Sequence, residues 1–143
     1  MSKTLGLMIL LVAEYRSLPP SSDHLPDTGP NDRKCNILSA LDEQANDPEV
    51  SQLLLEVLRD PREFDLARVE AIKVVGIYIS NDNLLAEQLW AEVYRIADSG
   101  EDLMLQGWAR QSVEFRRKRQ ARSHKQYKEP NNAIQPTRES KAD

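Results

Sequence analysis

The sequence predicts an all-α protein, and three observations lead to this prediction. Apolar residues recur with the three- and four-residue spacing of amphipathic helices along most of residues 1 to 115. Short segments rich in Asp, Asn, Pro and Gly separate the apolar stretches. Two of these stretches are similar to each other at a spacing of 36 residues, which is typical of repeated helix pairs.

The composition has no extreme bias. A chain of 143 residues that is 40% hydrophobic and 29% charged can form one domain with a modest core. Its single cysteine, Cys35, cannot form an internal disulfide, so nothing points to an oxidising compartment. Five glycines are too few for the usual phosphate-binding loops. We therefore expect a cytoplasmic protein that works without a cofactor.

The first apolar stretch, residues 5 to 13, has two interpretations. Lys3 precedes it and its length suits the hydrophobic region of a secretory signal, but no small-x-small cleavage pair follows. The alternative is a buried first helix that ends before Pro19 and Pro20. The stretch is much shorter than the roughly 20 apolar residues of a membrane span, so we expect no membrane association.

The next segments alternate between breaks and helices. A loop is expected over residues 18 to 31, where four prolines leave no apolar periodicity. Asp32 can cap a second helix, and Asn46-Asp47-Pro48 ends it and starts the next with proline in the first turn. That third helix is expected over residues 50 to 59, and Asp60-Pro61 ends it.

Three more helices are expected, over residues 64 to 79, 83 to 97 and 101 to 115. The first of these is apolar on nearly every side, as in a helix buried among its neighbours. Its β-branched residues would also suit a strand, but a length of sixteen residues favours a helix.

Trp90 and Trp108 lie in the last two of these helices. A pair of tryptophans can form a stacking platform for bases or an anchor for a partner. Because both helices also carry leucine at helical spacing, we expect the two tryptophans to belong to the core.

An internal repeat is the most informative feature of the sequence. Residues 53 to 59 align with residues 89 to 95, and Leu, Glu, Val and Arg occupy equivalent positions in both. With one inserted residue, Asp65-Leu66 aligns with Asp102-Leu103. The first sixty residues fit a degenerate third copy. A period near 37 in helix pairs belongs to the α-solenoid class.

The repeat resembles the HEAT type. Residues 54 to 61, LLEVLRDP, and residues 67 to 72, ARVEAI, are similar to that family's Leu-rich helix, Asp-Pro turn and second helix with a small-Arg-x-x-Ala motif. The resemblance covers residues 50 to 115. It departs from the family by two extra residues before Arg68, and by Gln106 where an arginine is expected.

The resemblance implies a short right-handed α-solenoid of about three antiparallel helix hairpins over residues 1 to 115. In the family, the arginine equivalent to Arg68 bridges neighbouring repeats through an acid, which here would be Asp65 or an acid of the following repeat. The residues expected to hold structural repeat positions are Leu53, Val57, Arg68, Leu89, Trp90, Val93 and Trp108.

Few residues are candidates for catalysis or metal binding. His24 and His124 lie in a loop and in the tail, far in sequence from Cys35, which we expect to be buried. Many carboxylates fall at helix starts, where capping of free amides explains them. These are Asp32, Asp47, Glu49, Glu63, Asp65, Asp82, Glu101 and Asp102. We therefore predict no catalytic residue and no metal site.

The charge is strongly asymmetric. Residues 1 to 115 carry 10 basic and 20 acidic side chains, a net charge of -10, whereas residues 116 to 143 carry 9 basic and 3 acidic, a net charge of +6. We expect this second segment to be a largely disordered tail. Its first thirteen residues hold seven bases and no acid: Arg116, Arg117, Lys118, Arg119, Arg122, Lys125 and Lys128.

The basic run has three interpretations. It can bind nucleic-acid phosphates in a sequence-independent and salt-dependent way. It also resembles a nuclear-import signal. The third interpretation is a solvated continuation of the last helix, inert or attracted to the acidic part of the chain.

The function predicted from these observations is that of a non-catalytic protein-binding adaptor or scaffold that uses the surface of a short helical solenoid. Its partner would be another protein, with weak and non-specific nucleic-acid binding through the tail. Two alternatives remain: a nucleic-acid-associated protein with a basic arm, and a small inhibitor or immunity-type protein that occludes an enzyme with its acidic surface.

Overall fold

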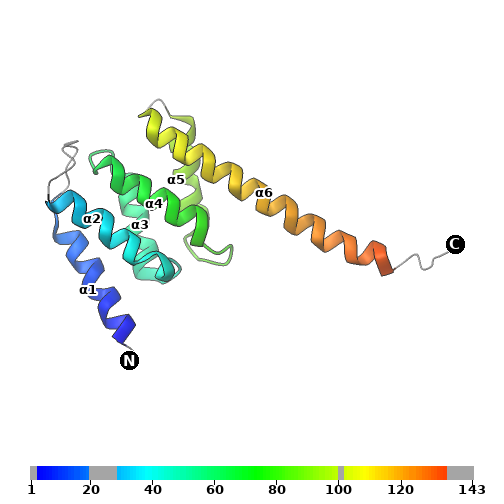
Figure 1. The fold of residues 1–143 in the computed structure, drawn as a ribbon, viewed down its shortest axis with the longest axis horizontal. Helices are drawn as coiled ribbons and strands as arrows, with labels where there is room; N and C mark the ends of the chain where they lie inside the picture. The colour runs from blue at the N-terminus through cyan, green and yellow to red at the C-terminus, as the bar shows by residue number, and fades with distance from the viewer. Residues whose placement is uncertain (1–2, 20–28, 100–101, 135–143) are drawn as a thin grey trace. The chain divides into compact units, whose positions relative to one another are not determined.

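A computed structural model describes residues 3–19, 29–99 and 102–134, and the side chains within these ranges from Leu5 to Ser123 (Figure 1). Helices account for most of the described residues, and none of these residues lies in a strand, which agrees with the all-α prediction. In chain order the elements are α1 (Lys3–Ser17), α2 (Gly29–Ala40), the short 3₁₀ helix η1 (Asp42–Gln44), α3 (Pro48–Arg59), α4 (Asp65–Tyr78), α5 (Ala86–Asp98) and α6 (Leu103–Ile134).

The chain divides into two compact units, Met1–Val113 and Glu114–Asp143. Helix α6 belongs to the first unit as far as Val113. Within the ranges that the structure covers, no helix is both long enough and apolar enough to cross a membrane.

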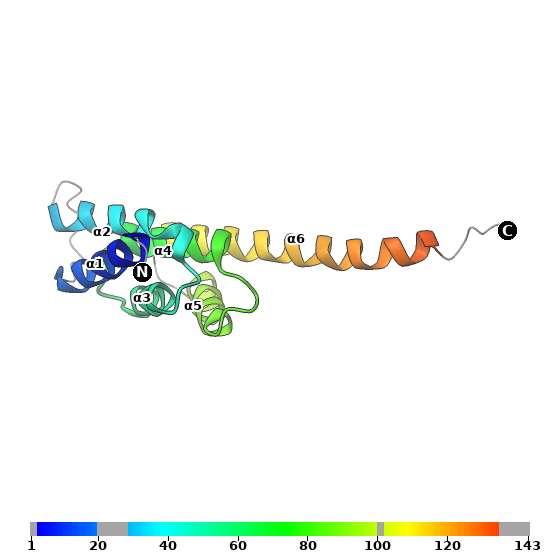
Figure 2. The same ribbon diagram turned by 90° about the horizontal axis from the view of Figure 1, so that it is seen from below.

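The helices of the first unit lie in two layers (Figure 2). In the first layer, α3 packs between α1 and α5. In the second layer, α2 packs against α4, and the part of α6 up to Val113 follows α4. Contacts of α1 with α2, and of α3 with α4, join the layers. Gly76 brings α4 close to α6, because a Cβ atom at this position would lie 2.8 Å from Ser112 Oγ. Successive helices of the first unit therefore alternate between the two layers.

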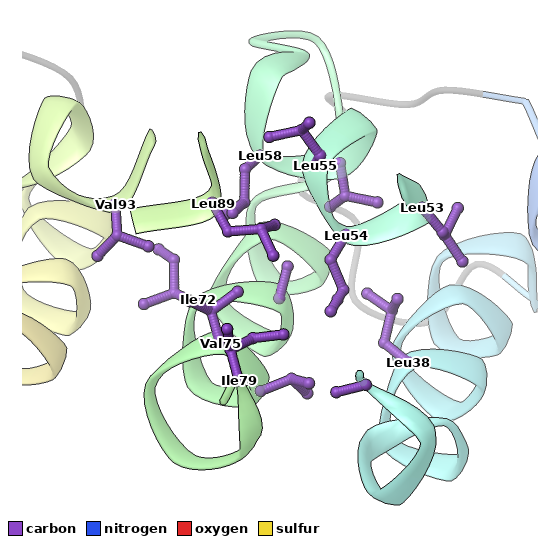
Figure 3. Packing of buried hydrophobic residues seen from close by; sticks show 14 of the residues in the cluster. Leu38, Leu53, Leu54, Leu55, Leu58, Ile72, Val75, Ile79, Leu89 and Val93 are labelled. Carbon is purple, nitrogen blue, oxygen red and sulfur yellow. The ribbon is translucent and has the colours of Figure 1, made fainter. Parts of the chain in front are cut away.

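Helix α3 is the centre of the core. It buries apolar side chains toward α1, α4 and α5, and leaves mainly Glu49, Gln52, Glu56 and Arg59 in solvent. Leucine, isoleucine and valine side chains from α2, α3, α4 and α5 meet there (Figure 3). Those labelled in the figure are Leu38, Leu53, Leu54, Leu55, Leu58, Ile72, Val75, Ile79, Leu89 and Val93.

Local signals explain where α3 and α6 begin. Asp47 has an extended backbone, and its Oδ1 accepts a hydrogen bond from the Glu49 amide at 2.9 Å, with Pro48 in the first turn. Asp102 Oδ1 accepts from the amide of Met104 at 2.8 Å and from that of Leu105 at 3.2 Å. Both carboxylates cap helices, as predicted from their places in the sequence.

Two boundaries differ from the prediction. The loop predicted over residues 18 to 31 ends earlier, because α2 begins at Gly29 and includes Asp32 in its first turn. Pro30 suits this position, since the amide that proline lacks has no partner in a first helical turn. The predicted helices at 50 to 59, 64 to 79 and 83 to 97 agree with α3, α4 and α5 to within three residues at each end.

The second difference concerns the basic segment. The sequence predicts a largely disordered tail from residue 116, but α6 continues as far as Ile134. Residues 116 to 129 contain no glycine or proline and are rich in Arg, Lys and Gln, which have high helix propensity. Residues 135 to 143 of the predicted tail lie outside the described residues.

Replacement of Leu89 by alanine tests the packing of α5 on α3. Leu89 is 0% exposed, so the loss of its side chain leaves a cavity and is expected to lower the free energy of unfolding by about 2 to 5 kcal/mol. Urea denaturation measures this change. Leu84→Ala is the control, because Leu84 is 95% exposed and its truncation is expected to change stability by less than about 0.5 kcal/mol. Equal stability of the two variants would contradict the packing.

Candidate functional site

The most unusual polar group in the first unit is a buried ion pair. Lys34 of α2 and Glu63 of the α3–α4 turn are 1% and 6% exposed, and Lys34 Nζ lies 2.6 Å from Glu63 Oε1. Glu63 Oε1 also accepts from the Phe64 amide at 2.9 Å, and Glu63 Oε2 accepts from the Tyr15 hydroxyl at 2.9 Å. This cluster joins α1, α2 and the α3–α4 turn.

The chemistry of the cluster is that of a structural contact. Three donors occupy the Glu63 carboxylate, which is the satisfaction that a buried charge requires. Burial, and next the Glu63 carboxylate, raise the pKa of Tyr15 far above its usual value, so the hydroxyl keeps its proton and remains a hydrogen-bond donor. From the sequence, Glu63 was expected only to lie at a helix start, and no sequence signal indicated that Lys34 would pair with it.

A cleft of about 180 Å³ lies beside this cluster, between the C-terminal ends of α1 and α3. Besides Tyr15, Lys34 and Glu63, its lining is mostly charged or apolar: Arg16, Leu18, Leu53, Glu56, Val57 and Asp60. Arg16 binds Glu56 through two hydrogen bonds of 3.2 and 3.0 Å. Except for Asp60, whose Oδ1 accepts from the Arg62 amide at 2.9 Å, the polar side chains that line the cleft bind one another and join the helices.

Cys35 follows Lys34 in α2 and is half-buried. Burial, and then the carboxylates of Glu70 and Asp32, raise the pKa of the Cys35 thiol to about 11. A thiol that stays protonated at neutral pH is a poor nucleophile and a poor metal ligand. Among the side chains that the structure covers, no three His, Cys, Asp or Glu residues are grouped to hold a metal ion. His24 and the side chain of His124 lie outside the described residues.

Arginine–glutamate pairs join successive helices of the first layer. The guanidinium of Arg16 at the end of α1 binds Glu56 of α3, and Arg59 Nε at the end of α3 lies 3.2 Å from Glu92 Oε2 of α5. Glu56 and Glu92 are equivalent positions of the 36-residue repeat. Because the side chains are partly exposed, each pair contributes about 1 kcal/mol or less, and its main effect is to set the register between helices.

A second connection joins the turns at the opposite ends of α3 and α5. Asn46 Oδ1 accepts from Asn83 Nδ2 at 3.0 Å and from the Ser80 amide at 2.9 Å. Asn83 Nδ2 also donates to Ser51 Oγ at 2.9 Å, and Asn83 Oδ1 accepts from the Leu85 amide at 2.8 Å. Helices α3 and α5 are thus joined at both ends, by the Arg59–Glu92 pair at one end and by the Asn46–Asn83 contact at the other.

Side chains of the second layer reach the C-terminal carbonyls of the first. Arg68 is 1% exposed and donates through Nη2 to the Leu58 carbonyl at 3.1 Å. Gln106, which stands where the family resemblance expects an arginine, donates to the Ser99 carbonyl, and Arg110 Nε donates to the Ala97 carbonyl at 3.0 Å. Carbonyls in the last turn of a helix have no intrahelical partner, so these donors satisfy them.

The two tryptophans differ in burial. Trp90 is 2% exposed and lies in the core, with Tyr94 packed against it at a centroid distance of 6.3 Å. Trp108 is only half-buried, and Lys73 Nζ lies 5.2 Å from the centre of its ring. Trp90 therefore lies in the core as expected, whereas Trp108 is partly buried and packs at the edge of the core, beside Lys73 of α4.

Beside Trp108, α4 has a single open stripe. Leu66, Glu70, Lys73 and Ile77 follow one another at helical spacing, with Leu66 and Ile77 45% and 57% exposed. Lys73 Nζ lies 3.2 Å from Glu70 Oε1 in the middle of the stripe. We call these four residues and Trp108 the α4 face. Sequence periodicity did not reveal it, because α4 is apolar on nearly every side.

The predicted repeat positions Leu53, Val57, Leu89 and Val93 are all buried, at 2% exposure or less. The seven bases predicted to contact nucleic acid, between residues 116 and 128, belong to the second unit. Arg117 and Lys118 are exposed, as is Arg122, whereas Arg116 and Arg119 are half-buried. Lys125 and Lys128 lie in the helical part of α6, and their side chains are outside the described residues.

Comparison with protein-family models, with curated proteins and with solved structures found no match.

Removal of the Lys34 ammonium tests the buried pair. Lys34→Met leaves the Glu63 carboxylate buried without its cation, and is expected to cost about 3 to 5 kcal/mol of stability. The double variant Lys34→Met/Glu63→Gln removes both charges and is expected to recover at least about half of that loss. Urea denaturation measures all variants. The control is Arg62→Met, which removes an exposed cation; a Lys34→Met effect no larger than this control would contradict the burial of the pair.

The thiol of Cys35 is expected to react slowly with iodoacetamide. At pH 8 a cysteine of ordinary pKa, about 8.5, is about one-quarter thiolate, and Cys35 is expected to be roughly 200-fold less ionised. Its labelling rate should rise with pH toward 11. The same chain in urea is the control, and equal labelling rates in the folded and unfolded chain would refute the shift.

By linkage, the raised pKa of the Cys35 thiol stabilises the fold below pH 8.5, and this stabilisation is lost as the pH rises from there through 11.

Proposed function

We propose that this protein is a non-catalytic adaptor that binds another protein through the α4 face, on a short right-handed α-solenoid of HEAT-like hairpins. The single observation that carries the proposal is the exposure of Leu66 and Ile77, beside half-buried Trp108, on a helix most of whose other residues are buried.

The contacts between hairpins support the solenoid part of the proposal. Alternate helices lie in separate layers, and α3 has the neighbours expected of a middle repeat, one hairpin on each side. The Arg16–Glu56 and Arg59–Glu92 pairs use equivalent glutamates in successive hairpins. A stack whose units each contact only their neighbours is the organisation typical of repeat proteins.

The chemistry of the α4 face supports a protein as the ligand. Interfaces between proteins combine an apolar centre with a few charged groups, and tryptophan is enriched among the residues that contribute most to binding. The α4 face has two exposed apolar side chains, a tryptophan and one charged pair. Its stripe spans three helical turns, which suits the apolar side of a partner helix or an extended segment.

The polar groups elsewhere in the first unit support a non-catalytic role. Lys34, Glu63 and Tyr15 are bound to one another, and the Cys35 thiol is held in its protonated form. These residues stabilise the stack that presents the α4 face.

The test compares binding by the full chain and by a double variant, Leu66→Glu/Ile77→Glu. Partners are captured from lysate of the source cell by crosslinking, identified by mass spectrometry, and then purified for calorimetry. The variant is expected to lose at least ten-fold in affinity, because it places two carboxylates in an apolar contact. Its melting temperature is expected to change little, since both positions are exposed.

The matched control is Leu10→Glu/Leu84→Glu, which adds the same charge at two exposed leucines on α1 and before α5. It is expected to bind as the unmodified chain does. Two outcomes would show that the α4 face is not the interface: the partner binds the α4 variant as tightly as the unmodified chain, or the control variant alone loses affinity for the partner.

A further inference from the structure

The second unit has a surface that the adaptor function does not use. Its helical part, residues 114 to 134 of α6, is called here the basic helix. Its first turns hold two local contacts: Arg117 Nη1 lies 3.0 Å from Glu114 Oε1, and the Arg119 guanidinium lies 5.1 Å from the centre of the Phe115 ring. Seven bases and no acid follow one another between residues 116 and 128.

The spacing of these charges along the helix is close to that of nucleic-acid phosphates. At about 1.5 Å per residue, the thirteen residues from 116 to 128 extend over about 20 Å, so their seven bases supply one charge for about every 3 Å. One strand of duplex DNA carries a phosphate for about every 3.4 Å along its axis. The helix and one strand therefore have matching charge densities.

The positions of the bases around the helix also favour a line of phosphates. At 3.6 residues per turn, five of the seven positions fall within about 140° of the circumference. These positions are 117, 118, 122, 125 and 128. A helix with most of its bases on one side can follow a phosphate backbone while its other side remains in solvent.

The apolar residues argue against a membrane surface and against single strands. From residue 114 to 134, the apolar positions are Phe115, Ala121, Tyr127, Ala133 and Ile134, which do not form a continuous stripe at helical spacing. A helix that inserts into a lipid surface needs such a stripe. With two aromatic residues twelve positions apart, the helix also lacks the row of rings on which unpaired bases stack.

We propose that the basic helix binds the phosphate backbone of duplex nucleic acid without reading its sequence. Arg117, Lys118 and Arg122 supply exposed charges on the side defined above, with Lys125 and Lys128 at the following positions. The net charge of -10 on residues 1 to 115 opposes this binding, so the affinity fades as salt approaches physiological concentration.

The experiment measures fluorescence anisotropy of labelled duplexes with the full chain over a range of salt concentrations. Two DNA duplexes of unrelated sequence and an RNA duplex of the first sequence serve as probes. All three are expected to bind within about three-fold of one another, because contacts are to phosphates. Lys118→Ala/Arg122→Ala is expected to reduce the slope of log affinity against log salt by about 1 for each lost contact, and so by up to about 2.

The control variant, Arg33→Ala/Arg62→Ala, removes the same charge from two exposed positions of the first unit and is expected to leave the slope unchanged. Vesicles of mixed phosphatidylserine and phosphatidylcholine serve as a competing anionic surface.

Three results would overturn the proposal: no binding of the unmodified chain at about 50 mM salt, equal effects of the two double variants, or tighter binding to vesicles than to duplexes at the same salt. A difference of more than ten-fold among the duplexes would also overturn it, because the helix would then be reading sequence or shape. None of these results bears on the α4 face, which lies in the other unit.

Discussion

The burial of α3 is the constraint on which the rest of the first unit depends. A helix with apolar residues toward three sides cannot satisfy them within one hairpin, so it needs a neighbouring hairpin on each side. The first hairpin supplies α1 and α2, and the third supplies α5. Met8, Val12 and Tyr15 of α1 are buried and cover one side of the core.

Polar contacts then select one register for the stack. Apolar packing alone tolerates small shifts of one helix along another, whereas the buried Lys34–Glu63 pair and the Asn46–Asn83 contact each require one alignment. The exposed Arg16–Glu56 and Arg59–Glu92 pairs add to this specificity more than to stability. The buried Lys34–Glu63 pair therefore acts mainly to fix the arrangement of the helices.

The two proposed activities use different physical interactions. Binding at the α4 face would bury apolar area and depend little on salt, whereas binding by the basic helix would release counterions and depend on salt strongly. The two proposed binding activities can therefore be distinguished by varying the salt concentration.

The sequence by itself determined most of the helices within residues 1 to 115, because their signals are local, but it missed the start of α2 at Gly29 and the continuation of α6 to Ile134. Apolar spacing, Asp-Pro and Asp-Asn breaks, and the caps at Asp47 and Asp102 all act within a few residues. It also determined the charge asymmetry and the 36-residue repeat. Only the tertiary structure decided which polar residues meet: Glu63 and Lys34 are 29 residues apart, and Tyr15 lies 48 residues from Glu63. The same holds for the α4 face, since a helix that is apolar all round has an open side only where its neighbours leave one.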